Sequence, residues 1–146
     1  FALFIIWLLI RKKVKVKKKG EMVLETDIDT FALVLKNLIE NAIKYSDNGL
    51  CLIECYENSI VIKNKGKPLK QPYTEYLKPF SRDKDNKKEG MGLGLYIVEK
   101  TCKSHNFTLS YDYENGFHCF TIMTTPPPQQ QIWQQPRKAQ KNGNKK

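Results

Sequence analysis

Three alternating glycines lead directly into an apolar-periodic segment at residues 90–100, GMGLGLYIVEK. Glycine permits positive φ angles and close backbone contact with a ligand, and a helix start offers unpaired N–H groups with partial positive charge. This combination predicts an anion cradle, and phosphate is the expected anion. A dinucleotide fingerprint would need a third glycine at Leu95 or Ile97, and a P-loop would need Gly-Lys followed by Ser or Thr. The alternative is a glycine-rich loop that only caps the following helix.

A helix is expected earlier in the chain, over residues 26–46. Thr26 and Asp27 supply capping groups at its start, and the Asp-Asn-Gly sequence at 47–49 ends it. Its apolar residues recur at helical spacing and are expected to form one core face: Ile28, Phe31, Leu35, Leu38, Ile39 and Ala42.

A polar stripe lies beside that face. Asn37, Asn41 and Lys44 follow one another at i, i+4 and i+7, so their side chains project within about 60° of one another. Asparagine is a middling helix former, and two on one stripe suggest an external reason. Amide oxygens suit hard cations and an ammonium suits phosphate, as a magnesium nucleotide would require. The alternative is a solvated polar face.

Turn signals and alternation predict strands in the rest of the chain. Residues 14–18 and 22–25 indicate a hairpin or two edge strands, and 50–56 with 59–63 indicate a hairpin turned at Glu57-Asn58. The helix after the glycines should end near Ser104. Further expected elements are a short helix or turn at 72–79, a mobile polar loop at 81–89, and a last hairpin of 107–111 and 117–123 across Asn115-Gly116.

The basic residues gather in two flanks. The sequence holds 25 Lys and Arg against 15 Asp and Glu, a formal charge of +10. Residues 11–19 hold seven basic residues and residues 126–146 hold five, with no acidic residue in either. The body between them is therefore close to neutral. This pattern argues for a membrane surface or loose polyanion contact rather than a dedicated DNA-reading face.

Residues 1–10, FALFIIWLLI, are continuously apolar and precede the first basic flank. A bilayer needs about 20 such residues, so this run spans about half of one as a helix. The chain begins without Met, and we expect the cut end of a longer protein: the last turns of a membrane helix, or a helix whose partner is missing. A buried strand or short core helix stays open. The predicted divisions are this segment with its basic flank (1–13), a globular domain (14–124) and a disordered basic tail (125–146).

The chain has four cysteines without CxxC spacing or the density of a disulfide scaffold: Cys51, Cys55, Cys102 and Cys119. We expect reduced core residues of a cytoplasmic domain. His105 and His118 have no Cys or His partner at ligand spacing, so each is expected on the surface or in a strand rather than at a metal.

Four segments resemble, in order and spacing, the N, G1, F and G2 boxes of sensor histidine kinases. They are NLIENAIKYS (37–46), IKNKGKPL (62–69), Pro79-Phe80 and GMGLGLYIVEK (90–100). That family belongs to the ATPase group shared with the Hsp90 chaperone, DNA gyrase and the MutL proteins. The resemblance covers about residues 14–124. It implies an α/β fold, an α+β two-layer sandwich whose mixed sheet packs on about three helices, with ATP between the helices and a flexible lid.

The resemblance also implies a set of binding residues. Asn41 with Asn37 would hold Mg²⁺ against the phosphates, with Lys44 and Tyr45 near them, and the glycine box would supply backbone amides. The implied ATP-binding residues are Asn37, Asn41, Lys44, Tyr45, Asn64, Gly66, Phe80, Arg82, Gly90, Gly92, Gly94 and Leu95.

The chain departs from the family pattern in the G1 box. Asn64 stands where the family usually has an Asp that accepts from the adenine amino group, and Pro68 stands where a second glycine is usual. Gly66 matches the pattern. Because an amide oxygen can still accept, we expect weakened or retuned adenine binding rather than none.

Asn37 separates this chain from the hydrolytic members, which resemble it but carry a Glu there as a general base. An amide cannot take a proton, so phosphoryl transfer to a partner is favoured over water attack. The acceptor histidine of the family lies on a dimerisation segment upstream of the first strand, and neither His105 nor His118 has that context. We therefore expect a protein-histidine kinase module that is incomplete on its own and has no catalytic residue in this chain.

The expected partners are a histidine-bearing dimerisation domain and a response regulator, with the chain itself a monomer and no specific nucleic acid. The expected location is cytoplasmic, with attachment to the inner membrane through the N-terminal segment as a further expectation. Two alternatives stay open. One is a degenerate nucleotide-binding module that regulates or docks without kinase activity, and the other is a basic membrane-surface or nucleic-acid contact protein.

Overall fold

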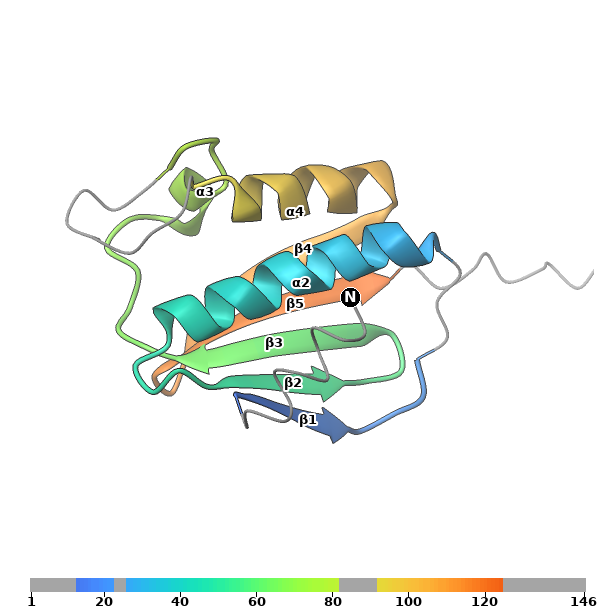
Figure 1. The fold of residues 1–146 in the computed structure, drawn as a ribbon, viewed down its shortest axis with the longest axis horizontal. Helices are drawn as coiled ribbons and strands as arrows, with labels where there is room; N and C mark the ends of the chain where they lie inside the picture. The colour runs from blue at the N-terminus through green and yellow to red at the C-terminus, as the bar shows by residue number, and fades with distance from the viewer. Residues whose placement is uncertain (1–12, 23–25, 82–91, 125–146) are drawn as a thin grey trace, which may run out of the picture.

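The computed structural model describes residues 13–22, 26–81 and 92–124. These residues form one mixed sheet in the order β1-β2-β3-β5-β4. The strands are β1 (Val14–Lys18), β2 (Cys51–Cys55), β3 (Ser59–Lys65), β4 (Phe107–Glu114) and β5 (Phe117–Thr124). Helices α2 (Ile28–Tyr45) and α4 (Gly94–Ser104) cover one face of the sheet, and the short α3 (Tyr73–Tyr76) lies near the start of α4 (Figure 1). The predicted two-layer α/β fold is confirmed.

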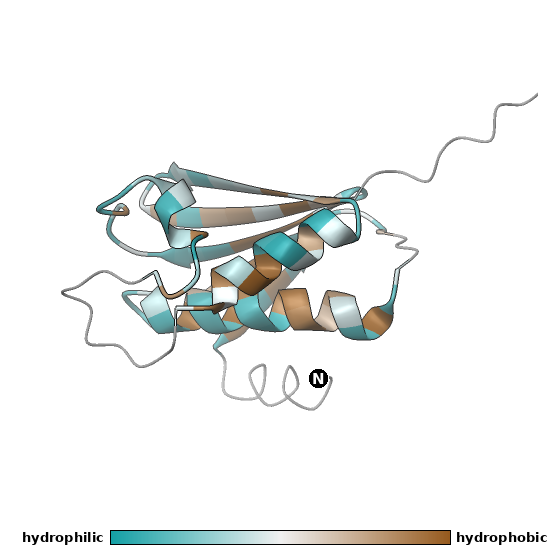
Figure 2. Ribbon diagram, turned by 90° about the horizontal axis from the view of Figure 1, so that it is seen from above, coloured by the Kyte–Doolittle hydropathy of each residue, from teal (hydrophilic) through white to brown (hydrophobic). Residues whose placement is uncertain are grey.

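Helix α2 begins at the predicted cap. The carboxylate of Asp27 accepts a hydrogen bond from the Thr30 backbone N–H at 2.8 Å, which satisfies one of the unpaired amides of the first turn. In Figure 2, α2 and α4 lie next to each other on the same side of the sheet. The fully buried residues of α2 are Val34, Leu38, Ile39 and Ala42, with Phe31 and Leu35 partly buried against the same core.

Two details of the predicted core face of α2 are wrong. Ile28 is 79% exposed, whereas Val34, which the prediction leaves out, is fully buried. Periodicity identifies the buried side of a helix but not which of its turns are covered. The first turn of α2 is uncovered, and Val34 lies one turn before the buried Leu38.

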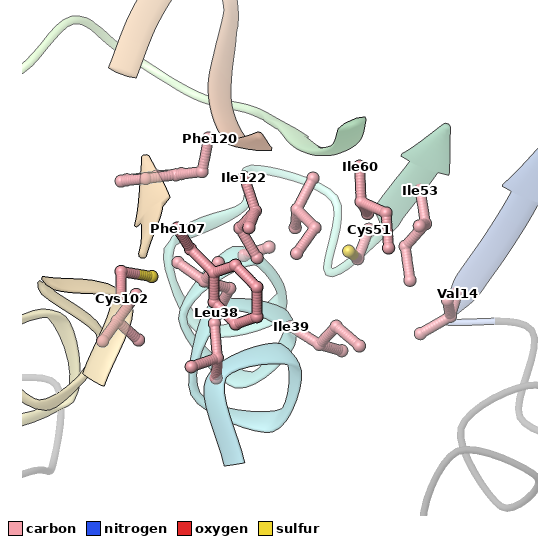
Figure 3. Packing of buried hydrophobic residues seen from close by; sticks show 14 residues of the cluster. Val14, Leu38, Ile39, Cys51, Ile53, Ile60, Cys102, Phe107, Phe120 and Ile122 are labelled. Carbon is pink, nitrogen blue, oxygen red and sulfur yellow. The ribbon is translucent and has the colours of Figure 1, made fainter. Parts of the chain in front are cut away.

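The core lies between the two layers. Figure 3 shows Leu38 and Ile39 of α2 among side chains from the sheet, with Cys102 of α4 beside them. Fully burying one such aliphatic side chain stabilises the fold by about 1.5–3 kcal/mol. The sheet contributes Val14, Cys51, Ile53, Ile60, Ile62, Phe107, Phe120 and Ile122.

The four cysteines are free thiols, as predicted. Cys51 and Cys102 are buried in the core, and burial raises the pKa of Cys51 to about 12 and that of Cys102 to about 11. Cys55 is partly buried and packs against the core. Cys119 is also partly buried, but it lines a shallow surface hollow with Val61 and Lys63, so its placement in the core is wrong.

Both predicted hairpins form. β2 pairs with β3, and β4 pairs with β5, each antiparallel. The turn between β4 and β5 has positive φ angles at Asn115 (52°) and Gly116 (80°). A two-residue turn with both angles positive matches the right-handed twist of the strands it joins, which explains the Asn-Gly sequence.

The sequence predicts residues 14–18 either as half of a hairpin with residues 22–25 or as an edge strand. The structure shows an edge strand. β1 pairs in parallel with β2, and Val14 lies opposite Cys51. Met22 lies outside any strand, and residues 23–25 of the second predicted run lie outside the described residues. The predictions for residues 1–12, 82–91 and 125–146 lie outside them too. Within the described ranges, no helix is long and apolar enough to cross a membrane.

Burial predicts unequal effects for two substitutions in α2. Leu38→Ala should lower the free energy of unfolding by about 2–5 kcal/mol, because it leaves a cavity in the core. Ile28→Ala should change it by less than about 0.5 kcal/mol, because the side chain is already in solvent. Urea denaturation of both variants measures these changes, and equal losses would contradict the described core.

Candidate functional site

Asn37 and Asn41 face the first turn of α4. A Cβ built on Gly94 would lie 3.4 Å from Asn37 Oδ1 and 3.4 Å from Asn41 Nδ2. Asn37 Nδ2 donates to the Leu33 carbonyl at 2.9 Å, so the oxygen of this amide is the atom near α4. No side chain among the described residues caps the start of α4. Its first backbone N–H groups and the two amides therefore meet in one place, as an anion with a cation would require.

Gly92 lies two residues before α4, where the backbone takes a conformation that favours glycine. Its φ of +71° is in the left-handed region, and a Cβ there would lie 2.6 Å from the Ser81 carbonyl oxygen. Phe80 also has a positive φ, 59°, and its side chain is 72% exposed. Ser81 Oγ donates to the Tyr76 carbonyl at 3.0 Å. The backbone on the two sides of residues 82–91 is thus in direct contact.

A second cluster lies where β3 ends. Asn64 is only 3% exposed, and its Nδ2 has no hydrogen-bond partner among the described residues. Asn64 lies opposite His118 of β5 in the sheet register. A Cβ on the buried Gly66 would lie 3.0 Å from His118 Nε2 and 3.3 Å from the Tyr45 carbonyl oxygen. Glycine at position 66 thus lets the end of β3 meet the end of α2.

Lys44 and Tyr45 connect the two clusters along α2. The Lys44 ammonium lies 5.1 Å from the centroid of the Tyr45 ring, and this ring is largely exposed. Asn41 and Tyr45 are four residues apart, so they are neighbours on one side of the helix, about 6 Å along it. Leu95 of α4 is partly buried against the core.

Three residues of the second cluster are absent from the predicted site. The hydroxyl of Tyr111 lies 2.9 Å from His118 Nδ1, and the hydroxyl of Tyr113 donates to the Gly66 carbonyl at 2.9 Å. Burial lowers the pKa of His118, while a hydrogen bond with the Lys67 backbone and the charge of Asp47 oppose the shift. Strand alternation could have placed His118 on the buried face, because it shares the parity of Phe120.

The two clusters contain six of the twelve predicted residues: Asn37, Asn41 and Gly94 in the first, and Tyr45, Asn64 and Gly66 in the second. Lys44 and Leu95 are chain neighbours of Tyr45 and Gly94, with Lys44 over the Tyr45 ring and Leu95 packed against the core. Phe80 and Gly92 meet each other beside the start of α4. Arg82 and Gly90 lie outside the described residues.

These residues fit a magnesium nucleotide on their chemistry. Gly94 leaves open the space in which a Cβ would touch two amides, and Asn64 has a buried donor without an acceptor. Amide oxygens are ligands for hard cations such as Mg²⁺. Among the described residues, no group of three or more His, Cys, Asp or Glu could hold a metal ion.

Comparisons with known proteins relate the chain to a family of ATPases and to sensor histidine kinases. The model of the family described as histidine kinase-, DNA gyrase B-, and HSP90-like ATPase matches residues 26–130. The chain is 40% identical over 101 residues to the sensor histidine kinase ArsS of Helicobacter pylori, covering 68% of this chain and 24% of that protein. It is 42% identical over 88 residues to the sensor histidine protein kinase HK06 of Streptococcus pneumoniae, covering 57% of this chain and 20% of that one. The chain thus spans a quarter or less of these relatives' lengths.

Solved structures share the fold. The mycobacterial sensor histidine kinase MprB superposes with a TM-score of 0.63 at 20% identity, covering 83% of this chain and 87% of that chain. The catalytic domain of histidine kinase ThkA, in a nucleotide-free form, superposes with a TM-score of 0.62 at 21% identity, covering 83% and 84%. At these identities the likeness concerns the fold alone.

The contact between Gly92 and Ser81 predicts a difference between two glycines with positive φ. Gly49 has a φ of +68° and nothing within 4 Å of a built Cβ, whereas Gly92 has backbone at 2.6 Å. Gly49→Ala should lower the free energy of unfolding by about 1–2 kcal/mol through backbone strain alone. Gly92→Ala should lower it further, because the Ser81 backbone must move. Urea denaturation compares them, and equal effects would contradict the contact.

The lowered pKa of His118 predicts a loss of stability in mild acid. The unfolded chain binds a proton at this residue near pH 6.5, and the folded chain binds it only at lower pH. Between these two pKa values the unfolded state holds more protons than the folded state. The contribution of neutral His118 to stability is therefore fully present above about pH 6.5 and is lost as the pH falls below that value.

Urea denaturation from about pH 5 to pH 8 measures this loss. His118→Gln should remove that part of the decline. His105→Gln, at the exposed C-terminal end of α4, serves as the matched control and should keep the wild-type profile. A profile that His118→Gln leaves unchanged would contradict the assignment.

Proposed function

Because the chain belongs to the histidine kinase-, DNA gyrase B- and HSP90-like ATPase family, we propose that it is the ATP·Mg²⁺-binding catalytic module of a two-component sensor histidine kinase. The match confirms the family resemblance that the four sequence boxes indicated, and the relatives named above are sensor histidine kinases. The observation that supports the finer proposal most strongly is the meeting of Asn37, Asn41 and the first turn of α4.

The two clusters would hold the two ends of the nucleotide. The phosphates would lie at Gly92, Gly94 and the backbone N–H of Leu95, where uncapped amides and the helix dipole favour an anion. Lys44 would add a positive charge on the same side of α2. The base would lie at Asn64 and Gly66, about one helical turn further along α2.

Asn41 with Asn37 would hold Mg²⁺ through amide oxygens. The ion would supply positive charge that offsets the charge of the phosphates when bound. Asn37 Nδ2 is already engaged by the Leu33 carbonyl, so its Oδ1 is the atom left for a cation. Phe80, Arg82 and Gly90 are further proposed contacts of ATP.

The amide of Asn37 also bears on the reaction. An amide cannot accept a proton from water at neutral pH, so it cannot serve as a general base for hydrolysis. The chain would therefore position the γ-phosphate for attack by a histidine rather than by water, through orientation and electrostatics. That histidine would lie on a dimerisation segment outside this chain.

The partners follow from this role. A histidine-bearing dimerisation domain would receive the phosphate, and a response regulator would take it onward, as two-component relatives suggest. We propose a monomer in solution, located in the cytoplasm and attached to the inner membrane through residues 1–13.

A second candidate function is a degenerate module that binds a nucleotide or a partner without kinase activity. Asn64 and Pro68 motivate it, because both depart from the family pattern in the G1 box. A folded chain that does not bind ATP at millimolar concentration would favour this candidate over the kinase module.

Gly94→Ala separates folding from binding. The added methyl would touch both amides at 3.4 Å, an ordinary contact distance, so the fold should be kept while access to the amides is lost. Calorimetric titration with a non-hydrolysable ATP analogue and Mg²⁺ should give about 5–8 kcal/mol of binding free energy for the wild type. Gly94→Ala and Asn41→Ala should each weaken binding by at least about tenfold.

Lys103→Ala, on the exposed last turn of α4, is the matched control and should bind as the wild type does. Omitting Mg²⁺ should also weaken binding. Tight binding to Gly94→Ala would contradict the proposed phosphate position, and no binding to any folded variant would favour the degenerate module.

A further inference from the structure

Asn64 is the most deeply buried polar residue of the candidate base site. Its exposed fraction is 3%, and its Nδ2 has no acceptor among the described residues. A buried donor without a partner costs about 1–3 kcal/mol, because the group loses its hydrogen bond to water on burial and gains none in return. The candidate base site therefore contains a donor for which a ligand atom could supply the acceptor.

Several neighbouring polar groups have hydrogen-bond partners of their own. The Nδ1 atom of His118 lies 2.9 Å from the Tyr111 hydroxyl, and its Nε2 atom faces Gly66. The Gly66 carbonyl accepts from Tyr113, and the Gly66 N–H donates to the Gly116 carbonyl at 3.1 Å. The Nδ2 atom of Asn64 therefore has no partner among the described residues that would hold it in one orientation.

The two orientations of the amide match two kinds of purine. A 6-aminopurine presents an exocyclic amine beside the N1 acceptor, and a 6-oxopurine presents an O6 acceptor beside the N1–H donor. An asparagine carries one donor and one acceptor side by side, so it can pair with either edge by turning. A carboxylate at the same position can only accept, and it would repel O6.

We propose that Asn64 reads the base with both amide atoms and that the site takes 6-oxopurine as well as 6-aminopurine nucleotides. The proposal rests on the proposed nucleotide function and specifies its substrate class. It assigns the departure from Asp at this position to base selectivity rather than to loss of binding.

Calorimetric titration with ADP and with IDP, each with Mg²⁺, tests this inference without relying on kinase activity. IDP differs from ADP only in the 6-oxo group and the proton on N1. The wild-type dissociation constants should lie within about tenfold of each other. In Asn64→Asp, which keeps the shape of the side chain but only accepts, the constant for IDP should rise at least about tenfold relative to that for ADP.

Two results would overturn the proposal while leaving ATP binding intact. One is a wild-type chain that binds ADP and rejects IDP by more than about a hundredfold. The other is an unchanged ratio in Asn64→Asp, which would mean that residue 64 does not read the base. If neither nucleotide binds to the folded wild type, the nucleotide function itself is wrong and this inference is wrong with it.

Thermal unfolding checks that each variant is folded. Should Asn64→Asp fail to fold because its carboxylate is buried, Asn64→Ala provides the test, since it removes donor and acceptor together. ADP and IDP should then weaken by equal factors, and weakening of ADP alone would overturn the proposal.

Discussion

The contact between Gly94 and the two asparagines of α2 is the constraint on which the candidate site depends. The first turn of α4 faces the amides of Asn37 and Asn41, and Gly94 leaves open the space in which a Cβ would touch both of them. Buried residues close to this contact along each helix, Leu38 on α2 and Val98 on α4, belong to the same core and keep the two helices together. Core packing on the buried sides of the two helices therefore fixes the position of the start of α4.

The same principle operates at the other end of α2. Gly66 approaches the Tyr45 carbonyl and the His118 ring, and any larger residue at 66 would push the end of β3 away. One rigid helix thus carries the proposed phosphate position and the proposed base position at a fixed separation. The short segment between Tyr45 and β2 carries its own hydrogen bonds, with the Asp47 N–H donating to the Lys65 carbonyl at 2.9 Å. This bond ties the end of α2 to the end of β3.

The sequence predicted the elements whose signals are local. Asp27 and the Asn115-Gly116 pair mark a cap and a turn through neighbouring atoms, so their roles follow from the residue types alone. The parallel pairing of β1 with β2 has no local signal, because it joins strands separated by the whole of α2. The residues of the candidate site divide in the same way, into those with a local sequence signal and those placed by long-range pairing. Motif spacing identified Asn41 and Gly94, but the burial of Asn64 and the closeness of His118 arise only when β3 and β5 pair.

The lysines of β1 have a structural explanation that requires neither a membrane nor a nucleic acid. β1 is the edge of the sheet, and an edge strand that exposes an unpaired backbone invites pairing with another chain. Lys15 and Lys17 are exposed along it, and flanking lysines on such an edge oppose strand addition by charge repulsion. Two lysines that follow also have partners inside the domain, because Lys18 pairs with Glu21 at 3.0 Å and Lys19 with Glu54 at 3.6 Å. The charge of this flank is therefore partly a property of the sheet, and only the charge beyond it bears on a membrane or a polyanion.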